Sequence, residues 1–228
     1  VLAMAAKAAE ALGVVKDGWN GFSILHTEAA LVGALDLGFV PGEGGKGTAE
    51  MLAPGALDVL FNLGADEIDI PAGPFVIYQG THGDRGAHRA DVILPGSAYT
   101  EKSATYVNTE GRVQMTGRAG FAPGDAREDW AILRALSGAL GKTLPFDTLG
   151  GLRKALYAVH PHFAALDQIA AGDAGDVAKL AGLGGAPGKA PFKPAIDDFY
   201  LTNPIARASG VMAECSALAR ARQAIAAE

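Results

Sequence analysis

Three short apolar runs constrain the fold of this chain more than any other feature. They cover residues 57–63, 74–78 and 91–94, and each run ends at a turn signal such as Gly64. Continuous apolar runs of this length are typical of strands that are buried on both faces of a parallel sheet. We therefore expect an α/β fold that is built on a parallel sheet.

Apolar residues at helical spacing predict the helices that flank this sheet. The clearest helix lies between residues 126 and 140, where Trp130, Leu133, Leu136 and Leu140 recur every three or four residues. Further helices are expected over residues 1–12 before Gly13, around Leu149, Leu152 and Leu156 before Pro161, and around Val177 and Leu180 before Gly182.

The segment 22–37 fits a strand or a helix about equally well. In the helical interpretation, Thr27 is the expected N-cap of a helix over residues 28–35.

The composition changes at residue 182, where a stretch rich in glycine and proline begins and runs to residue 194. This composition is typical of a linker. Asn203 and Pro204 then predict the start of a helix that runs toward Glu228. We expect a body over 1–181, a linker over 182–198 and a docking tail over 199–228. The tail would bind through an apolar stripe of Ile205, Ala208, Met212, Cys215 and Ala219, with Arg207 elsewhere.

Charge and cysteine content narrow the classes of partner. The chain has 19 basic and 25 acidic residues, a net charge of -6 and no dense basic run, so we expect no nucleic-acid binding. Every apolar stretch is interrupted before the roughly 18 residues of a spanning helix, so we expect no membrane insertion. With Cys215 as its one cysteine, the chain is expected to hold no disulfide and no iron-sulfur cluster.

The amino end lacks the features of a signal peptide, which indicates a helix entered partway through a longer protein, or a processed start.

A glycine pattern at residues 42–47 has the G-x-G-x-x-G spacing of a dinucleotide-binding loop. However, Glu43 places a negative charge where phosphate would lie, and Pro54 ends the following helix early. We interpret these residues as a flexible glycine-rich loop.

The loop over residues 81–91 is the best polar constellation in the sequence, because it holds two histidines, two aspartates and two arginines. Imidazole and carboxylate groups in the stretch from His82 to Asp91 could ligate a metal or act in acid-base chemistry. The neighbouring arginines favour ion pairs that hold the loop, and this is the interpretation we prefer.

Residues 90–114 carry a longer motif, in which a buried strand ending Leu-Pro is followed by a Glu-Lys turn and an Asn-x-Glu-x-Arg segment. This motif resembles the signature of the molybdopterin oxidoreductase superfamily. Residues 75–129 and 198–209 look like one branch of it, the large iron-sulfur subunit of NADH:quinone oxidoreductase, respiratory complex I. The resemblance extends over nearly the whole chain.

The resemblance implies a parallel-sheet, molybdopterin oxidoreductase-like domain with flanking helices and a helical tail. In that family an amino-terminal part carries the 2Fe-2S and 4Fe-4S clusters, and a domain without the pterin follows. This chain looks like the carboxy-terminal part of that domain, so we expect no catalytic, cofactor-binding or metal-binding residue in it. It would act as a scaffold, with the cluster-binding part and other peripheral-arm subunits as partners. Its expected location is peripheral, on the cytoplasmic face of a bacterial inner membrane or the mitochondrial matrix side.

The leading alternative is a fragment of a working molybdopterin enzyme, whose ligand contacts would include Glu101, Asn108, Glu110 and Arg112. Against it, no cysteine is placed to ligate molybdenum, and the Asp66-Glu67 pair would repel the phosphates of a pterin dinucleotide. We expect Glu110 and Arg112 to be structural. An isolated protein-interaction module is the third interpretation.

Overall fold

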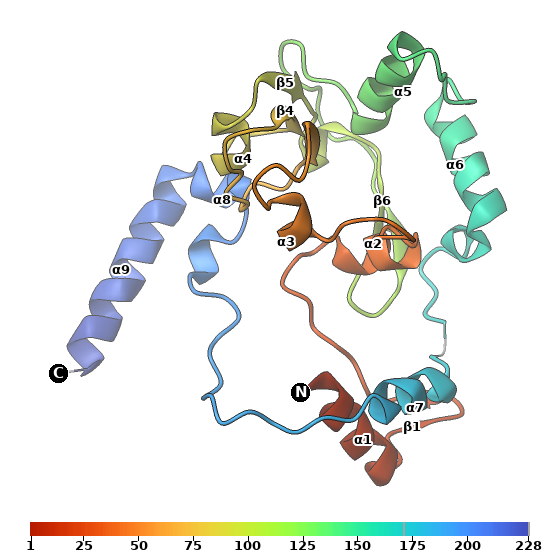
Figure 1. Ribbon diagram of the computed structural model, residues 1–228, viewed down its shortest axis with the longest axis vertical. Coiled ribbons are helices and arrows are strands. Elements are labelled where there is room, and N and C mark those ends of the chain that lie inside the picture. The colour runs from red at the N-terminus through yellow and green to blue at the C-terminus, as the bar shows by residue number, and fades with distance from the viewer. Residues whose placement is uncertain (171, 228) are drawn as a thin grey trace. The chain divides into compact units, whose positions relative to one another are not determined.

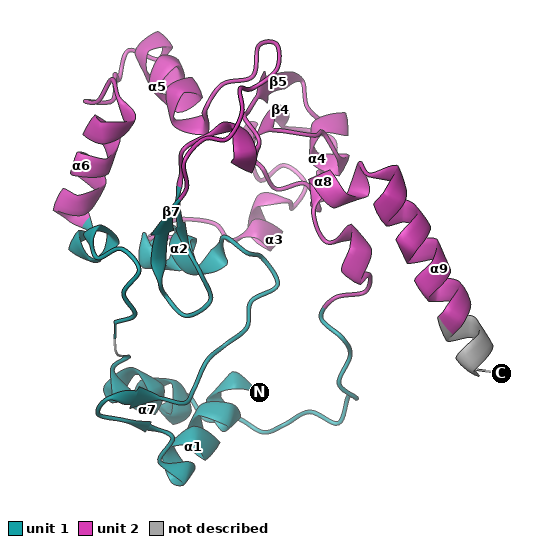
Figure 2. Ribbon diagram, turned by 180° about the vertical axis from the view of Figure 1, so that it is seen from behind, with its two compact units in different colours: residues 1–39, 105–115, 160–195 teal, residues 40–104, 116–159, 196–228 magenta. Residues whose placement is uncertain are grey.

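The computed structural model describes residues 1–170 and 172–227, with side chains described through residue 222 apart from that of residue 171. It divides the chain into two compact units, which are coloured separately in Figure 2. The first unit combines Val1–Phe39, Thr105–Met115 and His160–Ala195, and the second combines Val40–Ala104, Thr116–Val159 and Ile196–Glu228.

The second unit contains the parallel sheet that the apolar runs predict (Figure 1). Its strands are β3 (Val59–Leu63), β4 (Phe75–Gly80) and β5 (Val92–Pro95), in the order β3-β4-β5. Both pairings are parallel, with Val59 opposite Phe75 and Ile77 opposite Val92. The expected α/β fold class is therefore confirmed.

Burial differs between the middle and the edges of this sheet. Val76 and Tyr78 of the central strand β4 are buried, whereas Val59 of β3 and Ile93 of β5 are each 55% exposed. Burial on both faces was thus a correct expectation for β4 and a wrong one for the two edge strands. An edge strand has a neighbouring strand on one side only, so fewer side chains cover it.

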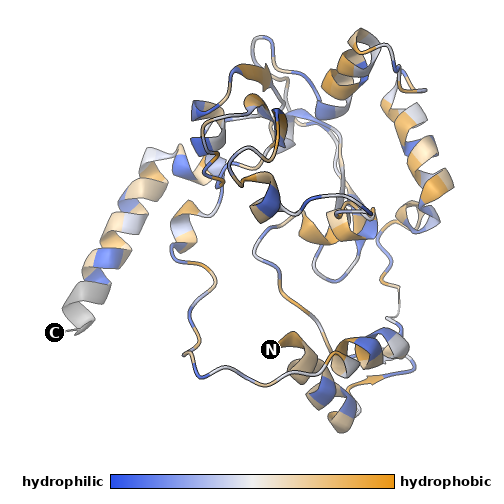
Figure 3. Cartoon of the chain, in the orientation of Figure 1, coloured by the Kyte–Doolittle hydropathy of each residue, from blue (hydrophilic) through white to orange (hydrophobic). Residues whose placement is uncertain are grey.

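The second unit also carries most of the predicted helices. They are α3 (Thr48–Met51), α4 (Arg85–His88), α5 (Asp129–Ala139), α6 (Leu149–Val159), α8 (Pro204–Arg207) and α9 (Gly210–Ala227), with the 3₁₀ turns η1 (Tyr99–Glu101) and η3 (Phe199–Leu201). The predictions of α5 and α6 are confirmed. Figure 3 shows hydrophobic and hydrophilic residues alternating along both helices, as expected for helices with one apolar face.

The tail begins as predicted but does not form one helix. The Asn203 side chain accepts a hydrogen bond from Ala206 N–H at 2.9 Å, which confirms the predicted cap. The helix ends at Arg207, and α9 starts afresh at Gly210, where the Ser209 hydroxyl accepts a bond from Met212 N–H at 3.3 Å. Ser209 acts as a new cap, so the expected continuous helix was wrong. Glu228, its expected end, lies outside the described residues.

The first unit is built around two helices, α1 (Leu2–Leu12) and α7 (Ala174–Gly182), which pack against each other. Ala6 and Ala9 of α1 are buried, as is Ala181 of α7, so small side chains let the two helices approach closely. Gly13 ends α1 with a φ of 61°, a conformation that favours glycine, as predicted.

Two hairpins and a short helix complete the first unit. The hairpins are β1 (Val15–Lys16) with β2 (Trp19–Asn20), and β6 (Thr105–Val107) with β7 (Val113–Met115); the 3₁₀ turn η2 spans Pro161–Ala164. The helix α2 (Leu31–Asp36) packs against β6. Its N-cap is Ala30, whose carbonyl accepts a bond from Ala34 N–H at 3.1 Å, so the expectation of Thr27 as the cap was wrong.

Residues 183–198 form no helix or strand within the described chain. The division into 1–181, 182–198 and 199–228 stays a prediction. Among the described residues, no helix combines the length and apolar character needed to cross a bilayer.

Candidate functional site

A polar cavity of about 360 Å³ lies at the carboxyl ends of β3 and β4 in the second unit. We call it the strand-end cleft. Its polar lining consists of Asp66, Gln79, Thr81, Lys102 and Asp129. Parallel α/β sheets bind their ligands outside the carboxyl ends of the strands, so this cleft is the first place to look for a site.

Three side chains meet at one carboxylate in this cleft. Asp129, the first residue of α5, forms an ion pair with the Lys102 ammonium group, and its Oδ1 accepts a bond from Gln79 Nε2 at 3.0 Å. The Lys102 and Asp129 side chains are 22% and 35% exposed, so the pair is partly shielded from water. Gly96 leaves room for the carboxylate, because a Cβ there would lie 3.0 Å from Asp129 Oδ1.

A buried tyrosine closes the floor of the cleft. The Tyr78 hydroxyl donates to Asp66 Oδ1 at 2.5 Å, and both residues are almost fully buried. Burial of the phenol and then its bond to Asp66 raise the pKa of Tyr78 above its usual value of 10.0. Asn62 holds the adjoining loop through two 3.1 Å bonds with the backbone of Ala65. This loop lies so close to Gly86 that a Cβ there would be 2.6 Å from Asn62 Nδ2.

The loop over residues 81–91 is held by ion pairs, which confirms the preferred interpretation of that segment. Arg85 contacts both carboxylate oxygens of Asp69, at 3.0 and 3.1 Å. Arg89 donates to the Pro74 carbonyl at 3.0 Å, and Asp91 accepts a bond from Val76 N–H at 2.7 Å. These charged side chains fix the loop to the sheet.

Asp84 in the same loop pairs with the tail. Arg207 forms an ion pair with Asp84 through Nε, and its guanidinium also donates to Glu67 Oε1 at 2.7 Å and to the Leu201 carbonyl at 3.0 Å. We call this set the Arg207 clamp. Arg207 was expected to lie away from the tail's contact, and that expectation was wrong. Met212, Cys215 and Ala219 of the expected stripe are partly buried, whereas Ile205 and Ala208 are exposed on the separate helix α8.

The residues proposed as pterin contacts are engaged in local structure. Glu101 accepts a bond from Ala98 N–H at 2.9 Å in the second unit. In the first unit, Asn108 Oδ1 accepts bonds from the N–H groups of Glu110 and Arg112, both at 3.0 Å. Arg112 donates to the Asp167 carbonyl at 2.7 Å and lies 3.5 Å from Glu110. The structure thus brings Asn108, Glu110 and Arg112 together in the β6–β7 turn.

The glycine-rich loop at residues 42–47 leads into α3, which is only four residues long. Gly47 N–H donates to Glu50 at 2.8 Å, and Lys46 donates to the Ala56 carbonyl at 3.0 Å. The lysine and the helix start therefore have partners within the loop. Across the part of the chain that the structure describes, no group of three or more histidine, cysteine, aspartate or glutamate residues could hold a metal ion.

Sequence reasoning missed the two strongest polar contacts of the second unit. Lys102 and Asp129 are 27 residues apart, and Arg207 and Asp84 are 123 residues apart. No local spacing rule connects such pairs. The available signal was that all four residues lie within the segments carrying the family resemblance.

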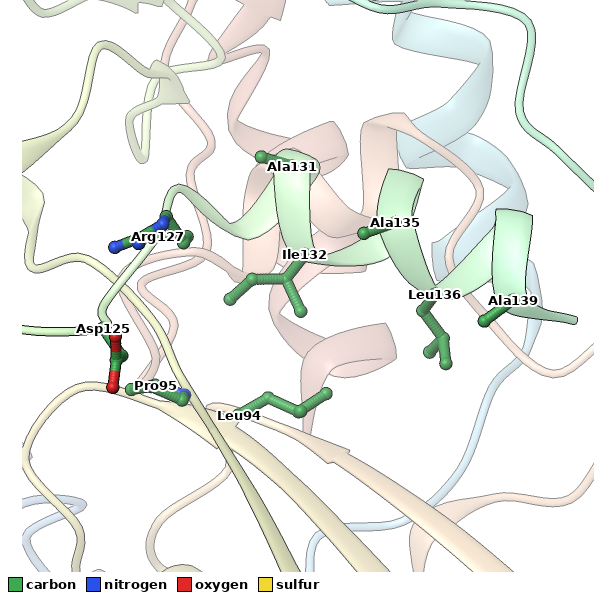
Figure 4. A pocket seen from close by; sticks show the side chains of 9 residues that line it. All are labelled: Leu94, Pro95, Asp125, Arg127, Ala131, Ile132, Ala135, Leu136 and Ala139. Carbon is green, nitrogen blue, oxygen red and sulfur yellow. The ribbon is translucent and has the colours of Figure 1, made fainter.

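An apolar groove of about 620 Å³ runs beside α5 in the second unit (Figure 4). We call it the α5 groove. Leu94 and Pro95 of β5 form one side, and α5 forms the other with its residues Ala131, Ile132, Ala135, Leu136 and Ala139. Asp125 and Arg127 lie at one end, where the Arg127 guanidinium donates to the Ala126 carbonyl at 2.8 Å. The groove suits packing better than chemistry.

Two family models match the chain. The model for molybdopterin oxidoreductase covers residues 1–139, and a model for the C-terminal region of an NADH-ubiquinone oxidoreductase polypeptide covers residues 164–215. The first of these matches more than half of the chain.

The residues of the strand-end cleft do not fit the pterin dinucleotide that this family name implies. Asp66 and Asp129 bring two negative charges to the cleft, and the ammonium group of Lys102 is already paired with Asp129. The phosphates of a dinucleotide would be repelled by the carboxylates and would find no free cation among the described residues that line the cleft.

Curated relatives agree with the family models. The chain is 47% identical over 88% of its length to the NADH-ubiquinone oxidoreductase 75 kDa subunit of Reclinomonas americana. It is 45% and 48% identical, over 87% and 86% of its length, to the mitochondrial 78 kDa subunits of Neurospora crassa and Candida albicans. It spans only 27 to 29% of the length of these relatives. From its sequence motif, its parallel sheet and these matches, the chain belongs to the molybdopterin oxidoreductase family.

Proposed function

We propose that this chain is a structural scaffold segment of the large iron-sulfur subunit of NADH:quinone oxidoreductase. The observation that carries the proposal is its 47% identity, over 88% of its length, to a 75 kDa subunit of NADH-ubiquinone oxidoreductase. The segment would support electron transfer from NADH to quinone without a redox centre of its own. The 2Fe-2S and 4Fe-4S clusters would belong to the amino-terminal part of the whole subunit.

The paired charges of the second unit support a scaffolding role. Lys102 is bound to Asp129, Arg207 to Asp84 and Glu67, and Arg85 to Asp69. The groups that a substrate would use are thus occupied in holding loops and the tail to the sheet. Electron transfer requires cofactors at fixed separations, and a domain stiffened in this way can hold its neighbours in place.

The proposed partners are the cluster-binding part of the same subunit and other subunits of the peripheral arm. The whole assembly would be a membrane-associated translocase, with this segment at the cytoplasmic face in bacteria or on the matrix side in mitochondria. Two surfaces of the second unit are suited to such contacts: the apolar α5 groove and the tail beyond residue 198. Residues 182–198 would serve as the linker before the tail.

Two measurements on the purified 228-residue chain test this role. Elemental analysis should find iron and molybdenum far below one atom per chain, and NADH oxidation with a quinone analogue should not exceed that of a denatured control. In cells, a tagged copy should co-purify with other subunits of the oxidoreductase. Stoichiometric molybdenum, or turnover by the chain alone, would contradict the scaffold role and favour a working pterin enzyme.

A further inference from the structure

The strand-end cleft gathers hydrogen-bond donors around a single point. The ammonium group of Lys102 and the amide Nε2 of Gln79 both donate to the carboxylate of Asp129. Lys102 comes from the turn after β5, Gln79 from β4 and Asp129 from α5, so three separate elements build the set. This is how a protein binds an anion, and here the anion belongs to the chain.

We propose that Asp129 is a built-in anion, which occupies the donors of Lys102 and Gln79 and so excludes phosphate-bearing ligands from the strand-end cleft. The disagreement between the family and its implied cofactor then has a specific cause in this chain. The cleft keeps the location and the donors of an anion site, but a side chain takes the place of the ligand.

A covalently attached carboxylate has a large advantage over a dissolved anion. Linking two binding groups in one chain gives an effective concentration in the millimolar range or above, so a free ligand must compete with a partner that never diffuses away. Shielding strengthens this effect, because the Lys102 side chain is 22% exposed and its unpaired charge would be costly there. Lys102 therefore holds an anion at all times, and Asp129 is the nearest one.

Asp66 adds a second barrier. With Lys102 positive and both aspartates negative, the cleft carries a net charge of about -1, which repels a further anion. Removal of Asp129 alone brings the charge to zero and leaves both donors without their acceptor. Replacing Asp66 with asparagine as well makes the cleft positive, and the asparagine oxygen can still accept the Tyr78 hydroxyl.

The test is titration of the full 228-residue chain with inorganic pyrophosphate, followed by calorimetry at low salt. The parent chain should show no saturable binding. Asp129→Ala should bind with a Kd on the order of 1 mM, and Asp66→Asn/Asp129→Ala about tenfold more tightly. Adding Lys102→Met to Asp129→Ala should abolish the gained binding, because the cation is lost.

Asp147→Ala is the matched control. It removes one exposed carboxylate of the same unit, the partner of Arg134 at 2.7 Å, and so changes the net charge by the same amount. Asp129→Asn keeps the size of the side chain and an acceptor for Gln79, so it decides the question if Asp129→Ala does not fold. It should gain weaker pyrophosphate binding.

The proposal is overturned if folded Asp129 variants gain no binding, if Asp147→Ala gains as much, or if the parent chain already binds pyrophosphate. Because only binding to the purified chain is measured, the scaffold role can fail or hold independently of this result.

Discussion

The strand-end cleft and the α5 groove both adjoin the parallel sheet of the second unit, yet they are completed in opposite ways. In the cleft, the carboxylates of Asp66 and Asp129 are matched by Tyr78, Gln79 and Lys102 from the same chain. The α5 groove presents aliphatic side chains and alanines around an open volume of about 620 Å³. A shielded charge without a partner costs several kcal/mol, whereas an open apolar surface costs much less and can be covered by another surface. The chain therefore closes its polar contacts internally and leaves apolar ones open.

The largest effect on stability is expected from opening the most connected polar contact, the Arg207 clamp. Arg207→Ala removes the partner of Asp84 and Glu67 and should lower the free energy of unfolding by about 3 kcal/mol, measured by urea denaturation. The matched control is Arg220→Ala, which removes another tail arginine that pairs with an acid, Asp198, but is 70% exposed. An equal loss in both variants would show that the shielding of the clamp is unimportant.

A smaller loss is expected from Tyr78→Phe, which leaves the buried Asp66 carboxylate without its donor. We expect a decrease of about 2 kcal/mol in the free energy of unfolding at neutral pH, with the exposed Tyr99→Phe close to the parent chain. The dependence on pH sharpens the test.

The folded-state pKa of Tyr78 is raised, so its contribution is fully present below the unfolded value of 10.0 and is lost as the pH rises above it. The difference between the parent chain and Tyr78→Phe should therefore shrink above about pH 10. A constant difference across that range would show that the hydroxyl is not the group that matters.

The smallest change in stability is expected in the α5 groove. Ala135 is exposed, so Ala135→Glu should alter the free energy of unfolding by less than about 0.5 kcal/mol. If the groove is a docking surface, the same variant should fail to co-purify with other subunits of the oxidoreductase, because a carboxylate would be buried in an apolar contact. The control is Ser137→Ala on the same helix, a residue outside the groove lining whose hydroxyl donates to the Arg134 carbonyl. Normal assembly of Ala135→Glu would remove the groove from the docking surfaces.

Local patterns predicted much of the fold and little of the cleft. The runs at 57–63, 74–78 and 91–94 predicted the three parallel strands, because continuous apolar segments of that length suit a parallel sheet. Asn203 and Pro204 predicted the start of α8, since capping depends on neighbouring residues. The break at Ser209 was missed, because a serine is equally compatible with a helix interior and with a cap, and only the surrounding contacts decide.

The sequence alone determined the family, the parallel sheet and the main helices, because these depend on residue types at short and regular spacings. The tertiary structure alone decided that Asp129 is the partner of Lys102 and Gln79, and that Arg207 binds Asp84 and Glu67. Charges many residues apart have no preferred partner in an extended chain. Each pair forms because the packing of the sheet, α5 and the tail brings the two groups within a few ångströms in a partly shielded place, where leaving either one alone would be costly.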